Sequence, residues 1–183
     1  MKVELLFPEI ANQFGDLGNM RYLARCLPQA EFCDTHLGEE PRFLREPVNL
    51  VYLGPMSEQG QEKVLEVLRP HRFALQKQLQ EGTPFLFTGN ALELLGERIE
   101  NEDGTRVEGL GLFPLTARRD MLHRHNSIFL GSFEGEPVMG YKSQFTMAYP
   151  GDKSLGLFLR ERGVGLNPRC PFEGVRVQNF FGT

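Results

Sequence analysis

The chain has 183 residues, enough for one domain with a substantial buried core. Its formal net charge of −4 and its pI of about 5.6 give no electrostatic footprint for nucleic acid or an acidic membrane. No stretch approaches the roughly 20 apolar residues of a membrane-spanning helix, and the N-terminus lacks the basic and apolar regions of a secretory signal. Three cysteines without a Cys-x-x-Cys pair favour reduced thiols and a cytoplasmic protein.

The first half of the chain alternates short apolar runs with helical patterns. Residues 2–7 form an apolar strand, and a loop rich in Gly and Asx residues then leads into a helix that contains Met20. Gly15 and Gly18 lack the spacing of a dinucleotide-binding loop, and no Lys-Ser/Thr pair follows them, which argues against a nucleotide site. Loop geometry and helix capping are the plainer interpretation of this loop.

Two further apolar runs, residues 49–54 and 84–88, predict buried strands, each followed by a helical pattern. Ser57 starts the helix after the first of them, and Pro70 divides the following stretch into two helices. Short strands that alternate with helices predict a parallel sheet whose right-handed crossovers place helices on both faces. No repeat, low-complexity tract or long linker interrupts the sequence, so a single domain over residues 1–183 is expected.

The turn after residues 84–88 has the strand–turn–helix pattern of a nucleophile elbow, in which a strained turn residue is raised above the sheet edge. Gly89 occupies the apex, and the spacing of Asn90 and Glu93 predicts a capping box for a helix that begins at Ala91. We expect Gly89 to adopt a positive φ, which glycine does at little cost. A glycine has no side chain with which to attack a substrate.

The second half of the chain is rich in predicted strands. Apolar runs separated by Gly, Pro and Asp turns place them at residues 110–116, 127–133, 137–149 and 175–181. His123 and His125 invite a metal interpretation, because a strand would put both imidazoles on one face. The sequence places no third acidic or thiol ligand beside them, so neither a metal site nor a cofactor is predicted.

Two segments resemble class I glutamine amidotransferases, in particular the branch that holds cobyric acid synthase and the glutaminase subunit of lipid II isoglutaminyl synthase. Members of this branch carry a Cys-Gly-Gly-Tyr-Gln-Leu-Leu-Gly elbow, followed by Asp-Gly and Glu-Gly-Leu-Gly. The matching residues are Leu94, Leu95, Gly96, Asp103, Gly104, Glu108, Gly109, Leu110 and Gly111, and, in the loop after the first strand, Pro8, Asn12, Gly15, Asp16, Gly18 and Asn19. The resemblance covers nearly the whole chain. It implies a three-layer, flavodoxin-like α/β domain with a mostly parallel central sheet and antiparallel C-terminal strands.

The same resemblance implies that the catalytic site is incomplete. The family's catalytic cysteine falls on Gly89, where no thiol is present. The family's Gly-Gly-Gly loop, whose N–H groups help hold the oxyanion, falls on Gly54, Pro55 and Met56. Proline has no N–H to donate, so an oxyanion hole of the family type is impaired.

Other family motifs are also only partly present. A family Gly-Tyr-Glu-x-His segment with a following arginine corresponds to Gly140, Tyr141, Lys142, Gln144 and Met147, of which the first two fit. The arginine that helps hold glutamine in the lipid II branch aligns near His123, with Arg124 beside it. Residues 173–183 resemble the family's Glu-Gly-Val…Gly-Thr segment, and the sequence stops before the Tyr-Leu-His that supplies the family's catalytic base.

No other residue is placed to act as the nucleophile. None of Cys26, Cys33 and Cys170 lies on a strand-to-helix turn, and Cys26 belongs to an amphipathic helix, where it suits a small buried hydrophobe. Thr88 is one residue away from the apex, and no Gly-x-Ser-x-Gly motif occurs. Glutaminase activity is therefore not expected. The residues that could line the cleft are Asn12, Gly54, Met56, Gly89, Asn90, His123, Arg124 and Gln144.

Two classes of function remain. The first is a catalytically degenerate amidotransferase-like protein that acts as a binding or partner subunit, with the old glutamine cleft empty or adapted to another small molecule. The resemblance implies a synthetase partner, which in the cell-wall branch is a Mur-ligase-like protein. The second class is an enzyme with different chemistry in the same cleft, or an amidotransferase with a relocated active site.

Overall fold

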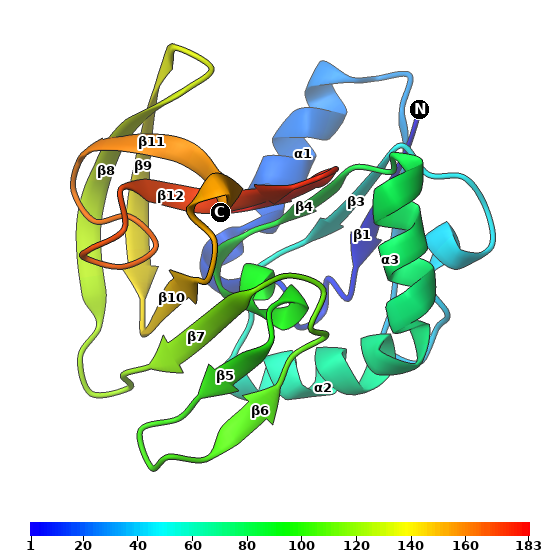
Figure 1. Ribbon diagram of the computed structural model, residues 1–183. Helices are drawn as coiled ribbons and strands as arrows, with labels where there is room; N and C mark the ends of the chain where they lie inside the picture. The colour runs from blue at the N-terminus through cyan, green and yellow to red at the C-terminus, as the bar shows by residue number, and fades with distance from the viewer. The chain divides into compact units, whose positions relative to one another are not determined.

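The computed structural model describes residues 1–183, and the chain folds into two compact units (Figure 1). The first unit comprises Met1–Ala91 and Gln178–Phe180, and the second comprises Leu92–Val177 and Phe181–Thr183. The single domain expected over residues 1–183 stays a prediction. None of the helices is long and apolar enough to cross a membrane.

Four parallel strands form the centre of the first unit. Their order is β2 (Glu31–Thr35), β1 (Lys2–Leu6), β3 (Leu50–Leu53) and β4 (Phe85–Phe87). Val3 lies opposite both Phe32 and Leu50, and Val51 lies opposite Phe85. The strands predicted at 2–7, 49–54 and 84–88 are thus confirmed as parallel neighbours, which agrees with their continuous apolar runs.

Alternate residues of these strands face opposite sides of the sheet. Val3, Leu5 and Tyr52 form a buried cluster with Met20 of α1 (Leu17–Cys26). The strand residues of the other parity are also buried; they are Leu6, Val51, Leu53, Phe85 and Phe87. Figure 1 shows α1 on one side of the strands and α2 (Glu58–Leu68) and α3 (Arg72–Glu81) on the other. Helices therefore cover both faces, as predicted.

Capping and proline set the boundaries of α2 and α3. The Ser57 hydroxyl accepts the N–H of Gly60 at 3.1 Å at the start of α2. A 3₁₀ turn, Arg69–His71, contains Pro70 and separates α2 from α3, which ends at Gly82 with a φ of 101°. The predicted helix start and the predicted break are both confirmed.

A segment distant in sequence completes the first unit. The backbone carbonyl of Asn179 accepts the N–H of Phe85 at 2.8 Å, and the Asn179 side chain donates to the Leu79 carbonyl at 3.1 Å. The fully buried Phe180 ring packs edge-on against Phe87, with 5.4 Å between ring centroids. Two 3₁₀ turns also belong to this unit, Gln13–Gly15 and Arg42–Leu44.

The second unit contains two groups of strands. One has the order β12 (Phe172–Val177), β11 (Gly156–Arg162), β8 (His125–Phe133) and β9 (Glu136–Gln144), and its pairings are antiparallel. The other has the order β10 (Thr146–Pro150), β7 (Leu115–Arg119), β5 (Arg98–Glu100) and β6 (Arg106–Glu108), with β5 and β7 parallel. The chain's shorter elements are the 3₁₀ helices Gly89–Leu95 and Lys153–Leu155 and the strand β13 (Phe180–Gly182). The predicted antiparallel C-terminal strands are confirmed.

The strand predicted at 110–116 is wrong over most of its length. The N–H groups of Leu110 and Leu112 donate to the carbonyls of Leu94 and Leu95, each at 2.8 Å. These bonds tie the segment to the turn that follows the elbow, so β7 starts only at residue 115.

Two other predicted strands are divided. Residues 137–149 form β9 and β10, which belong to different sheets. Residues 175–181 are interrupted at Gln178, whose φ of 54° turns the chain between β12 and β13. Strands β5, β6 and β11 were not predicted, because their short or charged sequences hide the alternation of apolar residues.

Candidate functional site

Asp16 joins three elements near the carboxyl ends of the parallel strands. Its Oδ2 accepts hydrogen bonds from the hydroxyl of Tyr52, at the end of β3, and from that of Thr88, after β4, the latter at 3.0 Å. The Asn19 amide donates to Oδ1 at 3.0 Å. Burial raises the pKa of the Asp16 carboxyl, although the bonds from Thr88 and Asn19 act in the opposite direction. Asp16 therefore holds the loop after β1 against the other two strands.

Gly54 lies where this loop approaches β3 closely. A Cβ at position 54 would come within 2.4 Å of the Ala11 carbonyl oxygen and 2.9 Å of Asp16 Oδ2, so no side chain fits. The N–H of Gln13 donates to the Pro55 carbonyl at 3.0 Å, which extends the contact by one residue. Gly54 thus has a packing reason to be a glycine.

Gly89 has a φ of 57°, which confirms the predicted positive φ at the apex of the elbow. A Cβ at this position would lie 2.8 Å from the Cβ of Pro55. Pro55 therefore occupies the space that a side chain at the apex would need.

The Asn90 side chain binds the backbone of Met56 at two points. Its Oδ1 accepts the Met56 N–H at 3.0 Å, and its Nδ2 donates to the Met56 carbonyl at 2.7 Å. The predicted capping role of Asn90 is wrong, because its amide is committed to Met56 and the 3₁₀ helix already begins at Gly89. The buried Gln61 amide donates to the Asn90 carbonyl at 2.8 Å, which further fixes the turn.

Asn12 has a capping role, as the plainer sequence interpretation held. Its Oδ1 accepts the N–H of Leu17, the first residue of α1, at 3.0 Å. Of the residues predicted to line the cleft, the first unit brings Gly54, Met56, Gly89 and Asn90 together around Pro55, with Asn12 in the adjoining loop.

The remaining predicted cleft residues lie in the second unit, near the start of β8 and the end of β9. His123 is exposed in the turn before β8, with Nδ1 2.8 Å from Asp120 Oδ1, a contact that lowers the pKa of Asp120. The Arg124 guanidinium lies 4.4 Å from the centre of the Phe145 ring, and Gln144 Nε2 lies 3.7 Å from the sulfur of Met147.

The metal interpretation of this segment rested on a strand that carries both imidazoles. Strand β8 begins at His125, so His123 belongs to the turn and the shared-face geometry was wrong. His125 contacts the Ser127 hydroxyl at 3.0 Å, and burial together with the Lys142 charge lowers its pKa.

A buried ion pair in the second unit was not predicted. Lys142 Nζ donates to Glu173 Oε2 at 2.5 Å and to the Gly165 carbonyl at 2.7 Å. Burial raises the pKa of Glu173, while the ammonium of Lys142 opposes that rise. In the sequence, Lys142 was noted only because the family motif has a glutamate at this position. Its opposite charge to Glu173 was the one signal from which the ion pair could have been predicted.

The cysteines differ from the expectation at one position. Cys26 is exposed at the last residue of α1, so its predicted burial is wrong; the side of α1 that packs on the sheet presents Met20 instead. Cys33 is buried in β2 with its sulfur 3.4 Å from the Val3 carbonyl, and burial raises the pKa of its thiol. Cys170 is also buried.

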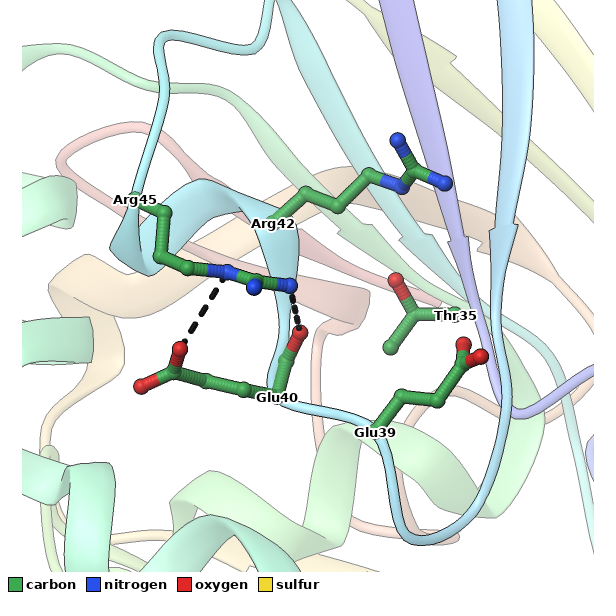
Figure 2. A pocket seen from close by; sticks show the side chains of 5 residues that line it. All are labelled: Thr35, Glu39, Glu40, Arg42 and Arg45. Carbon is green, nitrogen blue, oxygen red and sulfur yellow. Dashed lines mark hydrogen bonds and ion pairs between the residues drawn. The ribbon is translucent and has the colours of Figure 1, made fainter.

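A charged hollow of about 270 Å³ lies beside the carboxyl end of β2 and is lined by Thr35, Glu39, Glu40, Arg42 and Arg45. Figure 2 shows the Arg45 guanidinium against Glu40, with Nε 3.2 Å from the carboxylate and Nη2 donating to the Glu40 carbonyl at 3.1 Å. The buried Glu4 carboxylate accepts the Thr35 hydroxyl and the backbone N–H of Arg42, both at 2.6 Å, and the Arg42 guanidinium lies 3.7 Å from the Glu46 carboxylate. The charges of the hollow are thus largely satisfied by the chain itself.

Comparison of the sequence with known proteins gives a distant likeness. No protein-family model matches the chain. It is 21% identical over 174 residues to subunit GatD of the glutamine-hydrolyzing lipid II isoglutaminyl synthase from Staphylococcus aureus (strain N315). The match covers 94% of this chain and 71% of GatD.

Solved structures of glutamine amidotransferases share the fold. One from Thermotoga maritima matches with a TM-score of 0.64 and 14% identity, over 100% of this chain and 74% of that chain. A chain of PurLQS from Thermotoga maritima matches with a TM-score of 0.61 and 12% identity, over 99% of this chain and 84% of that one. A third amidotransferase gives 0.61 and 14%, over 99% and 87%. The predicted α/β fold of the amidotransferase type is confirmed, and the likeness to GatD supports that family.

Proposed function

We propose that this chain is a catalytically degenerate glutamine amidotransferase-like protein that acts as a binding or partner subunit rather than as a glutaminase. The observation that carries the proposal is the contact at the elbow, where Pro55 stands against Gly89. We place the protein in the cytoplasm, in a pathway related to lipid II amidation or to cobyric acid synthesis.

Glutamine hydrolysis by this fold requires a nucleophile at the apex and N–H donors that face the developing oxyanion. The apex residue is Gly89, and a Cβ there would lie 2.8 Å from that of Pro55. Pro55 has no N–H, and the N–H of Met56 already donates to Asn90 Oδ1 at 3.0 Å. The apex therefore has no room for a nucleophilic side chain, and the loop residues Pro55 and Met56 offer no free N–H to an oxyanion.

The likeness to GatD and to a chain of PurLQS supports a partner role, since GatD is a subunit of a synthase. The partner we propose is a synthetase, and in a cell-wall pathway a Mur-ligase-like protein. In this proposal, the position that corresponds to the glutamine cleft of the resemblance, near Asn12, Gly54 and Met56, is empty or holds a small molecule other than a glutamine undergoing hydrolysis.

The test is glutamate release from L-glutamine by the purified protein, alone and with a synthetase subunit encoded beside it. A glutaminase of the same fold serves as the positive control. We expect no glutamate above the protein-free blank in either mixture, together with a stable complex of the two proteins by calorimetry or co-purification.

Glutamate release would contradict the proposal and favour a relocated active site. The variants Cys26→Ser, Cys33→Ser and Cys170→Ser would then identify the nucleophile, because loss of a covalent nucleophile abolishes turnover. Turnover of a different substrate in the same cleft would favour the other alternative, an enzyme with new chemistry.

A further inference from the structure

Strands β8 and β9 share an exposed face whose centre is apolar and uncharged. Their register places on it the cross-strand pairs Asn126–Ser143, Ile128–Tyr141, Leu130–Met139 and Ser132–Pro137, which we call the apolar face. Met139, Tyr141 and Ile128 are 75%, 69% and 62% exposed. Leu159 of β11, opposite Ser132, extends the face and is 62% exposed. Arg162, past a bulge in β11, lies opposite Leu130 of this face.

The other sheet of the same unit shows what a solvated face of this chain looks like. Its outer residues include Arg98 and Arg118, which bind Glu100 at 2.9 and 3.0 Å, and the exposed Arg106 and Glu108. Charged residues make up 24% of the chain, yet the apolar face carries only Arg124 at one end, where it donates to Ser143 Oγ at 3.3 Å, and Arg162 opposite Leu130. A contiguous exposed apolar patch on a sheet marks an interaction surface.

Strand β9 also offers an open backbone edge. It is the last strand of its sheet and pairs with β8 over all nine residues without a bulge. Edge strands are normally protected by short length, charge, proline or bulges. In β9, Glu136 and Pro137 stand only at its start, and Lys142 is buried against Glu173 rather than exposed.

We propose that two copies of this chain pair through β9, antiparallel about a twofold axis at Gly140. Because the pairs that flank Gly140 on this face, Ile128–Tyr141 and Leu130–Met139, carry no charge, two copies can meet there without repulsion, although the chain carries a net charge of −4. A twofold contact needs a self-complementary patch, and this register sets Met139 against the partner's Tyr141 on both sides of the axis. Thioether sulfur and aromatic rings attract each other. A Cβ at Gly140 would meet nothing within 4 Å, so the axis is unobstructed.

The first test measures mass in solution, by light scattering and sedimentation at micromolar concentration. The wild type is expected at twice its 20.8 kDa chain mass. Met139→Glu and Tyr141→Lys are expected to be monomers, because each buries two unpaired charges at the twofold contact. Phe73→Glu is the matched control, since Phe73 is 75% exposed on α3, outside the face; it should remain a dimer.

The second test mixes the two monomeric variants. A heterodimer of Met139→Glu with Tyr141→Lys has one Glu–Lys pair and one native Met–Tyr pair across the axis, so mixing should restore the dimer. Independently, Gly140→Cys with Cys26→Ser should form a disulfide-linked dimer on oxidation, because residues at the axis lie directly opposite each other.

Three outcomes would overturn the proposal. They are a monomeric wild type, a dimer that survives both face variants, and a dimer that Phe73→Glu disrupts equally. Failure of both mixing and cross-linking would overturn the register. A wild-type monomer whose apolar face binds a different protein would also contradict the proposal that a second copy of this chain occupies the face. None of these outcomes bears on glutamine hydrolysis, so this inference and the proposed function fail separately.

Discussion

Pro55 fills the space that a side chain at position 89 would need. The two Cβ atoms would be 2.8 Å apart, well inside the separation at which carbon atoms attract each other. Gly89 also has a φ of 57°, a conformation that other residues adopt only with strain. Pro55 and Gly89, 34 positions apart in the chain, therefore form a single packing arrangement.

Gly89→Ala should lower the free energy of unfolding by more than the left-handed backbone penalty, which is about 1–2 kcal/mol. Gly104→Ala is the matched control: its φ is 84°, and a Cβ there would meet nothing within 4 Å. Urea denaturation of the two variants should show a larger loss for Gly89→Ala. The double variant Gly89→Ala/Pro55→Gly removes the Pro55 ring, so it should recover part of the stability that Gly89→Ala loses beyond the loss of Gly104→Ala. Equal losses at positions 89 and 104 would contradict the packing argument.

Gly89→Cys should not create a glutaminase. The thiol would be held against Pro55, and the loop would still lack donors for the oxyanion. Glutamate release is the readout, measured for Gly89→Cys and for Gly89→Cys/Pro55→Gly. Turnover by the single variant would mean that the remaining machinery is intact, and the proposed function would fall with it.

Asn90→Ala should destabilise the chain by about 1–3 kcal/mol, because it leaves the buried N–H and carbonyl of Met56 without the hydrogen bonds that the Asn90 side chain provides. Asn90→Asp keeps the acceptor for the Met56 N–H and loses the donor, so its cost should differ from that of Asn90→Ala. Thermal and urea denaturation measure both. A negligible change in Asn90→Ala would show that water replaces the amide.

Asp16→Asn should change stability in a pH-dependent way. Burial raises the pKa of Asp16 above its usual 3.8, so the folded chain binds this proton more tightly than the unfolded chain does. The resulting stabilisation is fully present below the usual pKa and is lost as pH rises through the raised one. The advantage of the wild type over Asp16→Asn should therefore shrink as pH increases.

Asp152→Asn provides the control of opposite sign. Hydrogen bonds from Ser154 lower the pKa of Asp152, so its contribution is present above the usual pKa and is lost as pH falls through the lowered one. Denaturant midpoints across the acidic range measure both variants. Parallel profiles for the two would refute the assignment.

Lys142→Met should destabilise the chain by about 3–5 kcal/mol, because it leaves Glu173 buried without its counter-charge. Lys142→Met/Glu173→Leu should recover most of the loss. Glu134→Gln is the control, since the Glu134–Arg176 pair is exposed at 69% and 48% and should contribute only about 0–1 kcal/mol. A double variant no better than Lys142→Met would mean that packing, rather than charge, sets the cost.

Local signals in the sequence were sufficient for the parallel strands and the elbow. The Phe85–Phe87 run and the glycine after it lie next to each other in the chain, so their arrangement can be predicted from order alone. The role of Asn90 could not, because its capping-box spacing is local while its partner Met56 is 34 residues away. The Lys142–Glu173 pair spans 31 residues, and only the folded chain decides which opposite charges are buried together.

The return of Asn179 and Phe180 to the first unit has a consequence for how the protein is made. Phe85 and Phe87 receive their hydrogen bond and their ring contact from residues that a ribosome adds almost 100 positions later. Until then, the edge of β4 and the aromatic surface of Phe85 and Phe87, which is buried in the folded chain, are accessible to other chains. The unit that starts first in synthesis is thus completed only when almost the whole chain has been made, and a nascent chain stalled in between is the form most prone to aggregate.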